Sequence, residues 1–186
     1  MVLFINPISS DITVSLLEDS TCRETYIIPK WDDFSQFPEK VIELVDAHSI
    51  KEIWCICGPG AFTRMRIVTL TLTTLRLSKG IRLKWCHFFD LVIEWMPILQ
   101  ANDREYIIET AKWITTLIEK ENIPSGTYIW YGDKNDFTDA KVFIEYREDA
   151  REISQVFRQI EHTEVLSPIY LKDPHITCSK KNTSPF

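Results

Sequence analysis

The stretch that decides the fold is Cys57-Gly58-Pro59-Gly60-Ala61-Phe62-Thr63-Arg64-Met65-Arg66-Ile67, which follows the apolar run Ile53-Trp54-Cys55-Ile56. A continuous apolar run is typical of a parallel strand that is buried on both faces. Gly58 and Gly60 can adopt positive φ, Pro59 stiffens the turn between them, and Thr63 is the expected helix N-cap. Helix N-termini favour anions, so the turn is a phosphate or carboxylate site, a rigid contact surface, or a tight connection without a ligand.

Three segments carry a resemblance to a known family. Residues 58–67 resemble the Gly-Pro-Gly-Ser-Phe-Thr-Gly-Leu-Arg-Ile signature of the TsaB (YeaZ) family, the glycoprotease-like subunit of the bacterial machinery for threonylcarbamoyladenosine in transfer RNA. Residues 2–10 are similar to the first strand and loop of that family, and Pro168-Ile169-Tyr170-Leu171-Lys172 resembles its C-terminal Pro-x-Tyr-Leu-Arg. The resemblance implies an α/β protein with an actin-like, ribonuclease-H-like (ASKHA) fold. Its two half-domains would be residues 1–99 and a reduced second half, residues 100–186.

Periodicity and turn residues predict the elements along the chain. Residues 68–73 alternate apolar side chains with threonine, which favours a strand, but the resemblance favours a helix and no hairpin signal follows. We therefore predict a helix over 64–79 that ends at Gly80. The first half is expected to hold strands 2–5, 12–17, 24–28, 53–57 and 82–86 and helices 38–48, 64–79 and 88–99, the last interrupted at Pro97. The second half is expected to hold strands 106–110, 113–118 and 127–131 and a helix over 148–160.

Composition and charge exclude several classes of protein. With 186 residues and a net charge of −6, the chain is long enough for a real core but lacks the basic balance that direct nucleic-acid binding requires. Its five cysteines have no metal-knuckle spacing, which favours reduced thiols in a cytosol. The apolar start has no basic flank and is too short to span a membrane, so we expect a soluble, cytoplasmic protein.

Catalytic motifs are missing from the sequence. The four histidines show no metal-ligand spacing, and there is neither a nucleophile elbow nor a Walker lysine. Actin-like kinases carry a carboxylate at the end of the first strand, where this chain has Asn6. Acidic pairs in polar turns (Asp103 with Glu105, Asp133 with Asp136) are interpreted as solvated charges, and Cys57 as a buried structural thiol. We therefore expect no catalytic residue, metal or cofactor.

The resemblance implies a non-catalytic subunit that pairs with and stabilises its longer paralogue TsaD, and an ATPase, TsaE, that docks on the pair. The turn and interface residues would be Gly58, Pro59, Gly60, Phe62, Thr63 and Arg66, and the C-terminal motif Pro168, Tyr170, Leu171 and Lys172. The helical pairing face would be Arg64, Met65, Leu72, Leu75 and Arg76, so that an aspartate at position 72 would abolish pairing and leave the monomer folded.

The chain departs from the family at two places. Arg64 stands where the family has glycine, and threonine and leucine replace alanine and glycine in the second helix, which would change the helix-helix interface. A basic concentration made of Arg64, Arg66, Arg76, Lys79, Arg82 and Lys84 is either a solvated helix flank or a patch for an acidic partner or phosphate. Two alternatives to the TsaB-like role stay open. One is an enzyme, an actin-like nucleotide-dependent phosphotransferase or a glycoprotease-like peptidase, and the other is a homodimeric structural protein without a role in transfer RNA.

Overall fold

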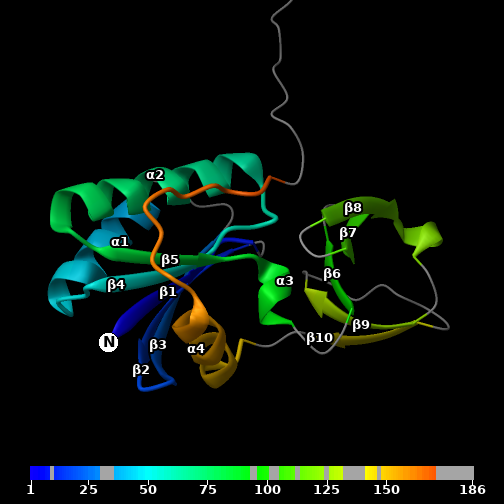
Figure 1. Ribbon diagram of the computed structural model, residues 1–186, viewed down its shortest axis with the longest axis horizontal. Helices are drawn as coiled ribbons and strands as arrows, with labels where there is room; N and C mark the ends of the chain where they lie inside the picture. The colour runs from blue at the N-terminus through cyan, green and yellow to red at the C-terminus, as the bar shows by residue number, and fades with distance from the viewer. Residues whose placement is uncertain are drawn as a thin grey trace, which may run out of the picture.

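The computed structural model spans the whole chain, and the residues that it describes form two five-stranded sheets (Figure 1). The residues that the structure describes are 1–8, 11–29, 36–92, 96–100, 105–111, 114–123, 126–131, 141–145 and 148–170. No helix within these ranges is both long enough and apolar enough to cross a lipid bilayer.

The first sheet has the strand order β3-β2-β1-β4-β5. Its strands are β1 (Val2–Asn6), β2 (Ile12–Glu18), β3 (Thr21–Ile28), β4 (Glu52–Ile56) and β5 (Arg82–Cys86). The first three strands form an antiparallel meander, and β4 and β5 join β1 in parallel. The apolar run Ile53-Trp54-Cys55-Ile56 thus lies in a strand between two others, as its composition predicts.

Helices cover both faces of the first sheet (Figure 1). Alternate residues of β1 point to opposite faces, so Leu3 and Ile5 join a core with α1 (Gln36–Ala47) and α2 (Phe62–Lys79), while Phe4 joins another with α3 (Phe88–Leu91) and α4 (Ala150–Gln159). In the second core the Phe157 ring stacks on Trp54 at 5.2 Å and meets Phe4 edge-on at 5.8 Å. A helix from the last quarter of the chain thereby stabilises the sheet that contains the first strands.

The segment with strand-like periodicity is a helix, α2, as we expected. Its threonine hydroxyls donate hydrogen bonds to carbonyl groups one turn earlier, Thr71 to Ile67 at 2.9 Å and Thr74 to Leu70 at 2.8 Å. These bonds satisfy β-branched polar residues that otherwise disfavour helices. Gly80 ends the helix in the left-handed conformation, with φ 66°. The N-cap prediction is wrong, because Ala61 precedes the helix without a side-chain cap and Thr63 lies inside its first turn.

The second sheet has the strand order β8-β7-β6-β9-β10, which repeats the order β3-β2-β1-β4-β5 of the first sheet. Its strands are β6 (Met96–Gln100), β7 (Glu105–Ala111), β8 (Ile114–Glu119), β9 (Gly126–Tyr131) and β10 (Lys141–Glu145). As in the first sheet, three antiparallel strands are followed by two parallel ones. Only the single turn η1 (Lys120–Asn122) is described between β8 and β9, where the first half has α1.

The prediction of a helix over 88–99 is wrong. α3 ends at Leu91, and residues 96–100 form β6, the central strand of the second sheet, because they pair with both β7 and β9. These long-range hydrogen bonds outweigh the local helical pattern. A division into residues 1–99 and 100–186 therefore does not coincide with the two sheets, since β6 belongs to the second and α4 packs on the first.

Candidate protein interface around the Gly-Pro-Gly turn

The Gly-Pro-Gly turn is bound to the C-terminal motif of the chain. The Ile169 amide donates to the Cys57 carbonyl at 2.8 Å, and the Gly60 amide donates to the Ile169 carbonyl at 3.1 Å. The Tyr170 ring lies 4.7 Å from the Phe62 ring, between centroids. The structure thus brings together two motifs that were singled out separately in the sequence. Leu171 and Lys172 lie outside the described residues.

The two glycines of the turn have different roles. Gly58 has φ +124°, and a Cβ atom there would lie 2.3 Å from the Ile169 carbonyl oxygen. Gly60 does not have a positive φ, contrary to expectation, and its Cβ would meet the flexible Met65 side chain at 2.7 Å. The peptide between Gly58 and Pro59 is cis. The close approach of Gly58 and the hydrogen bond from the Gly60 amide are both to residue 169. The turn is therefore a rigid structural joint, and its contacts do not support an anion site there.

Four of the five residues of the helical pairing face that we expected are buried inside the monomer, and Arg76 is partly exposed. Met65, Leu72 and Leu75 are at most 2% exposed. Arg64 is also buried, and its guanidinium donates to the Pro7 carbonyl at 3.2 Å. Those four residues cannot meet a partner while the chain is folded, and their assignment to an exposed face is wrong.

A different face of α2 is exposed. Leu70 and Leu77 are 58% and 72% exposed, one heptad apart. With their exposed neighbours they form what we call the α2 stripe, which consists of Thr63, Arg66, Leu70, Thr74 and Leu77. On α1, Ile42 is 41% exposed. The sequence could have indicated this stripe through the spacing of positions 63, 66, 70, 74 and 77, but the alternating threonines obscured which leucines face the core.

Four members of the basic concentration form ion pairs, and their carboxylate partners belong to three residues, Asp46, Glu52 and Glu164. Lys79 pairs with Asp46, and Arg76 lies 3.7 Å from Glu164. Arg82 and Lys84 lie 3.3 and 3.8 Å from Glu52, which also accepts from Trp54 Nε1 at 2.6 Å and lies 3.7 Å from His162. These ion pairs favour the interpretation as solvated and structural charges.

The end of β1 is closed by hydrogen bonds. The Asn6 amide, fully buried, donates to the Glu148 carboxyl group, and its oxygen accepts from the Ile8 amide at 3.1 Å. The Thr13 hydroxyl donates to the same carboxyl group at 3.3 Å. Burial raises the pKa of Glu148, while the hydrogen bonds from Asn6 and Thr13 lower it. A neutral amide engaged with a partner thus occupies the position where we looked for a metal-binding carboxylate, and no sequence signal pointed to Glu148.

His87 lies at the end of β5 and caps α3. Its Nδ1 atom accepts from the Phe89 amide at 3.2 Å, and its own amide donates to Asp90 at 3.1 Å. Burial lowers the pKa of His87, against the opposing charges of Asp90 and Glu109. The bonds describe a neutral imidazole with a capping role.

The cysteines near the turn are poor nucleophiles. Burial raises the pKa of the Cys57 thiol to about 12 and also raises the pKa values of Cys55 and Cys86. These shifts agree with the interpretation of Cys57 as a structural thiol. Among the described residues, no group of three or more histidine, cysteine, aspartate or glutamate side chains could hold a metal ion.

Comparison with known proteins supports the fold. No protein-family model matches the chain, and no curated protein matches it. YeaZ from Pseudomonas aeruginosa superposes with a TM-score of 0.62 at 14% identity, over 91% of this chain and 99% of that one. An uncharacterised protein with similarity to peptidase YeaZ, from the same organism, superposes with a TM-score of 0.61 at 13% identity, over 92% and 99%. The chain therefore has the fold of YeaZ along nearly its whole length.

Proposed function

We propose that this chain is a divergent, non-catalytic subunit of the TsaB (YeaZ) type that pairs with a TsaD-like paralogue in the formation of threonylcarbamoyladenosine in transfer RNA. The observation that carries the proposal is the likeness in fold to YeaZ over 99% of the length of that protein. The repeated strand order of the two sheets supports an actin-like fold of two half-domains. The acidic net charge of −6 supports a role in which the paralogue, and not this chain, contacts the RNA in the cytoplasm.

The hydrogen bonds at the end of β1 support the absence of catalysis. Asn6 offers a metal no charge, and its amide is engaged by Glu148. We expect the isolated protein neither to hydrolyse ATP nor to cleave peptides. Metal-dependent turnover that Asn6→Ala abolishes would favour the phosphotransferase alternative instead.

The α2 stripe, with Ile42 of α1, is the surface that we assign to the paralogue. Leu70 and Leu77 offer exposed apolar area at the spacing of two helical turns, which suits packing against helices of a partner. Apolar anchors at the centre of an interface dominate its affinity, whereas a rim arginine such as Arg66 mainly affects the association rate. An ATPase of the TsaE type would then dock on the assembled pair.

Size-exclusion chromatography after co-expression with the TsaD-like protein of the same organism tests the proposal. We expect a complex with the wild type and none with Leu70→Asp/Leu77→Asp. The matched control is Val165→Asp, since Val165 is 73% exposed but lies outside both helices. Circular dichroism checks that each variant is folded.

Each other outcome is informative. The absence of any complex with the wild type would contradict the proposed function, and self-association through the same stripe would favour the homodimeric alternative. If the complex still forms with Leu70→Asp/Leu77→Asp, the proposed function would stand, but the α2 stripe would not be the surface that binds the paralogue.

A further inference from the structure

One edge of the first sheet is covered and the other is open within the described structure. At β5, the chain after α4 returns along the edge, and the Thr163 amide donates to the Leu83 carbonyl at 2.9 Å. At β3, the opposite edge, no described strand pairs with the outer side (Figure 1). An open edge presents backbone groups that can pair with another chain.

The two ends of β3 differ in how they are protected. Near its start, a bulge lies opposite the step from Leu16 to Leu17, and Arg23 forms an ion pair with Glu18 at 2.9 Å. Bulges and charges of this kind usually discourage pairing. The end of the strand, residues 25–28, keeps a regular register with β2, and Ile27 there is 62% exposed. Pairing with another strand is therefore hindered at one end and left open at the other.

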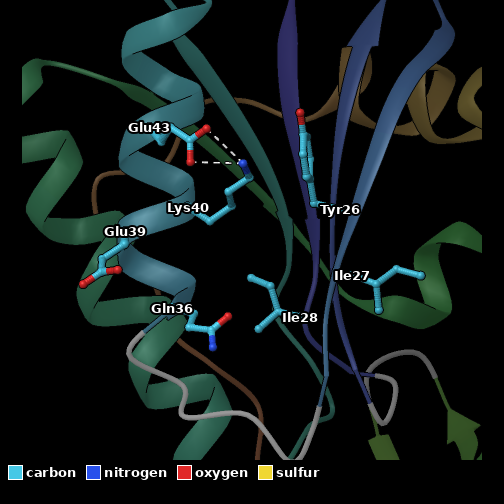
Figure 2. Close-up of a pocket in the computed structure, with 7 residues that line it drawn as sticks. All are labelled: Tyr26, Ile27, Ile28, Gln36, Glu39, Lys40 and Glu43. Carbon is cyan, nitrogen blue, oxygen red and sulfur yellow. Dashed lines mark hydrogen bonds and ion pairs between the residues drawn. The ribbon is translucent and has the colours of Figure 1, made fainter.

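A hollow of about 390 Å³ lies beside the open end, between β3 and α1 (Figure 2). It is lined by Tyr26, Ile27, Ile28, Gln36, Glu39, Lys40 and Glu43. In this hollow the Lys40 ammonium group lies 4.3 Å from the centroid of the Tyr26 ring and 3.0 Å from Glu43. The hollow thus already holds the ammonium group of the chain's own lysine between an aromatic ring and a carboxylate.

The hollow retains negative charge. Glu39 makes no hydrogen bond or ion pair with another described residue, and it lies one turn from Glu43 on α1. The pKa of Tyr26 is raised, first by its hydrogen bond with Glu24, then by burial and by the charges of Glu24 and Glu43. One lysine against the two carboxylates that line the hollow, Glu39 and Glu43, leaves a surface that attracts a further cation.

We propose that residues 25–28 bind an extended lysine- or arginine-containing segment of a partner protein, which pairs as a sixth strand and places one cationic side chain beside Glu39 and Glu43. Main-chain hydrogen bonds would supply affinity, and the hollow would supply selectivity for the cation. A second copy of this chain is a poor occupant, because its own Glu24, Glu39 and Glu43 would meet the same carboxylates. The surface is separate from the α2 stripe, so the proposal stands independently of the pairing with the TsaD-like paralogue.

Two labelled peptides of about eight residues, a common strand length, test this proposal by fluorescence anisotropy. One alternates lysine with valine, and the other alternates glutamate with valine. We expect the lysine peptide to bind and the glutamate peptide not to bind. Glu39→Gln/Glu43→Gln should weaken binding by about fivefold or more, whereas the control Glu161→Gln/Glu164→Gln, with the same change in net charge, should have an effect of less than about twofold.

Hydrogen exchange locates the peptide. We expect it to protect backbone amides within residues 25–28 and to leave those of β5 unchanged. Failure of both peptides to bind, or equal weakening by both double variants, would overturn the proposal, the latter because it reveals only non-specific attraction to an acidic protein. Protection of residues 25–28 by self-association, without peptide, would identify a second copy as the occupant and also overturn it. Neither result would alter a complex formed through the α2 stripe.

Discussion

The buried amide of Asn6, at the end of the first strand, donates a hydrogen bond to the carboxyl group of Glu148, 142 residues later in the chain. This bond links the start of the first sheet to the segment that enters α4. Asn6→Asp would keep an acceptor for the Ile8 amide but place two carboxyl groups together. Because like charges cannot both ionise cheaply at one site, we expect the free energy of unfolding at pH 7 to fall by about 1–3 kcal/mol. Urea denaturation measures the change.

The double variant Asn6→Asp/Glu148→Gln provides the control for that prediction. The glutamine amide can donate to the new carboxylate, so the direction of the bond is reversed and much of the stability should return. If Asn6→Asp alone is as stable as the wild type, the hydrogen bond does not hold this junction.

Glu148 should make stability depend on pH in a specific direction. Its pKa in the folded protein is raised above the unfolded value of 4.5. The folded state therefore binds the proton more tightly, and this stabilisation is complete below pH 4.5 and is lost as the pH rises through the folded pKa. Glu148→Gln keeps an acceptor for Asn6 and Thr13 and carries no charge. We expect it to remove this decline and to raise stability near neutral pH, in urea titrations from pH 4 to 8, whereas Glu161→Gln on the exposed surface should leave the profile unchanged.

His87 should make stability depend on pH in the direction opposite to that of Glu148. Its folded pKa lies below the unfolded value of 6.5, so its contribution is complete above pH 6.5 and is lost as the pH falls through the folded pKa. Protonation removes the Nδ1 acceptor of the Phe89 amide, which caps α3. Asparagine is a good cap that does not titrate, so His87→Asn should flatten the acid limb. Thermal melts at several pH values measure this, with His48→Asn at an exposed site as the control. The prediction would be contradicted if both variants kept the wild-type dependence of stability on pH.

The glycines of the turn offer a matched pair of substitutions. Gly58→Ala puts a Cβ atom against the rigid backbone of Ile169 at a positive φ, so we expect a loss of about 2–4 kcal/mol. Gly60→Ala meets only the flexible end of Met65 and should cost about 1 kcal/mol. Equal losses in chemical denaturation would mean that the contact with residue 169 does not constrain the turn.

Leu72 and Leu70 separate folding from pairing on one helix. Leu72 is fully buried, so Leu72→Ala should cost about 2–5 kcal/mol and Leu72→Asp should prevent folding. Leu70 is mostly exposed, so Leu70→Ala should change stability by less than about 0.5 kcal/mol. Circular dichroism during urea titration distinguishes the two. A stable Leu72→Asp monomer would restore the pairing face inferred from the resemblance.

The sequence by itself determined the first sheet and the connections around it. Three local signals are the apolar run of β4, the turn residues between the early strands and Gly80 after α2. Each determines the structure of the residues that carry it. The motif after β4 also indicated a constrained turn, and Gly58 does adopt the backbone conformation that only glycine takes readily.

Only the tertiary structure decided what those local patterns could not. Residues 96–100 form a strand because β7 and β9 pair with them, and a local window contains neither partner. Leu72 is buried and Leu70 exposed because the sheet lies under one side of α2, while both leucines alternate with threonine in the same way. Ile169 reaches the Gly-Pro-Gly turn and Glu148 reaches Asn6 from more than a hundred residues away. Contacts of such separation depend on how the whole chain folds back on itself, so the sequence near either partner does not show that the two meet.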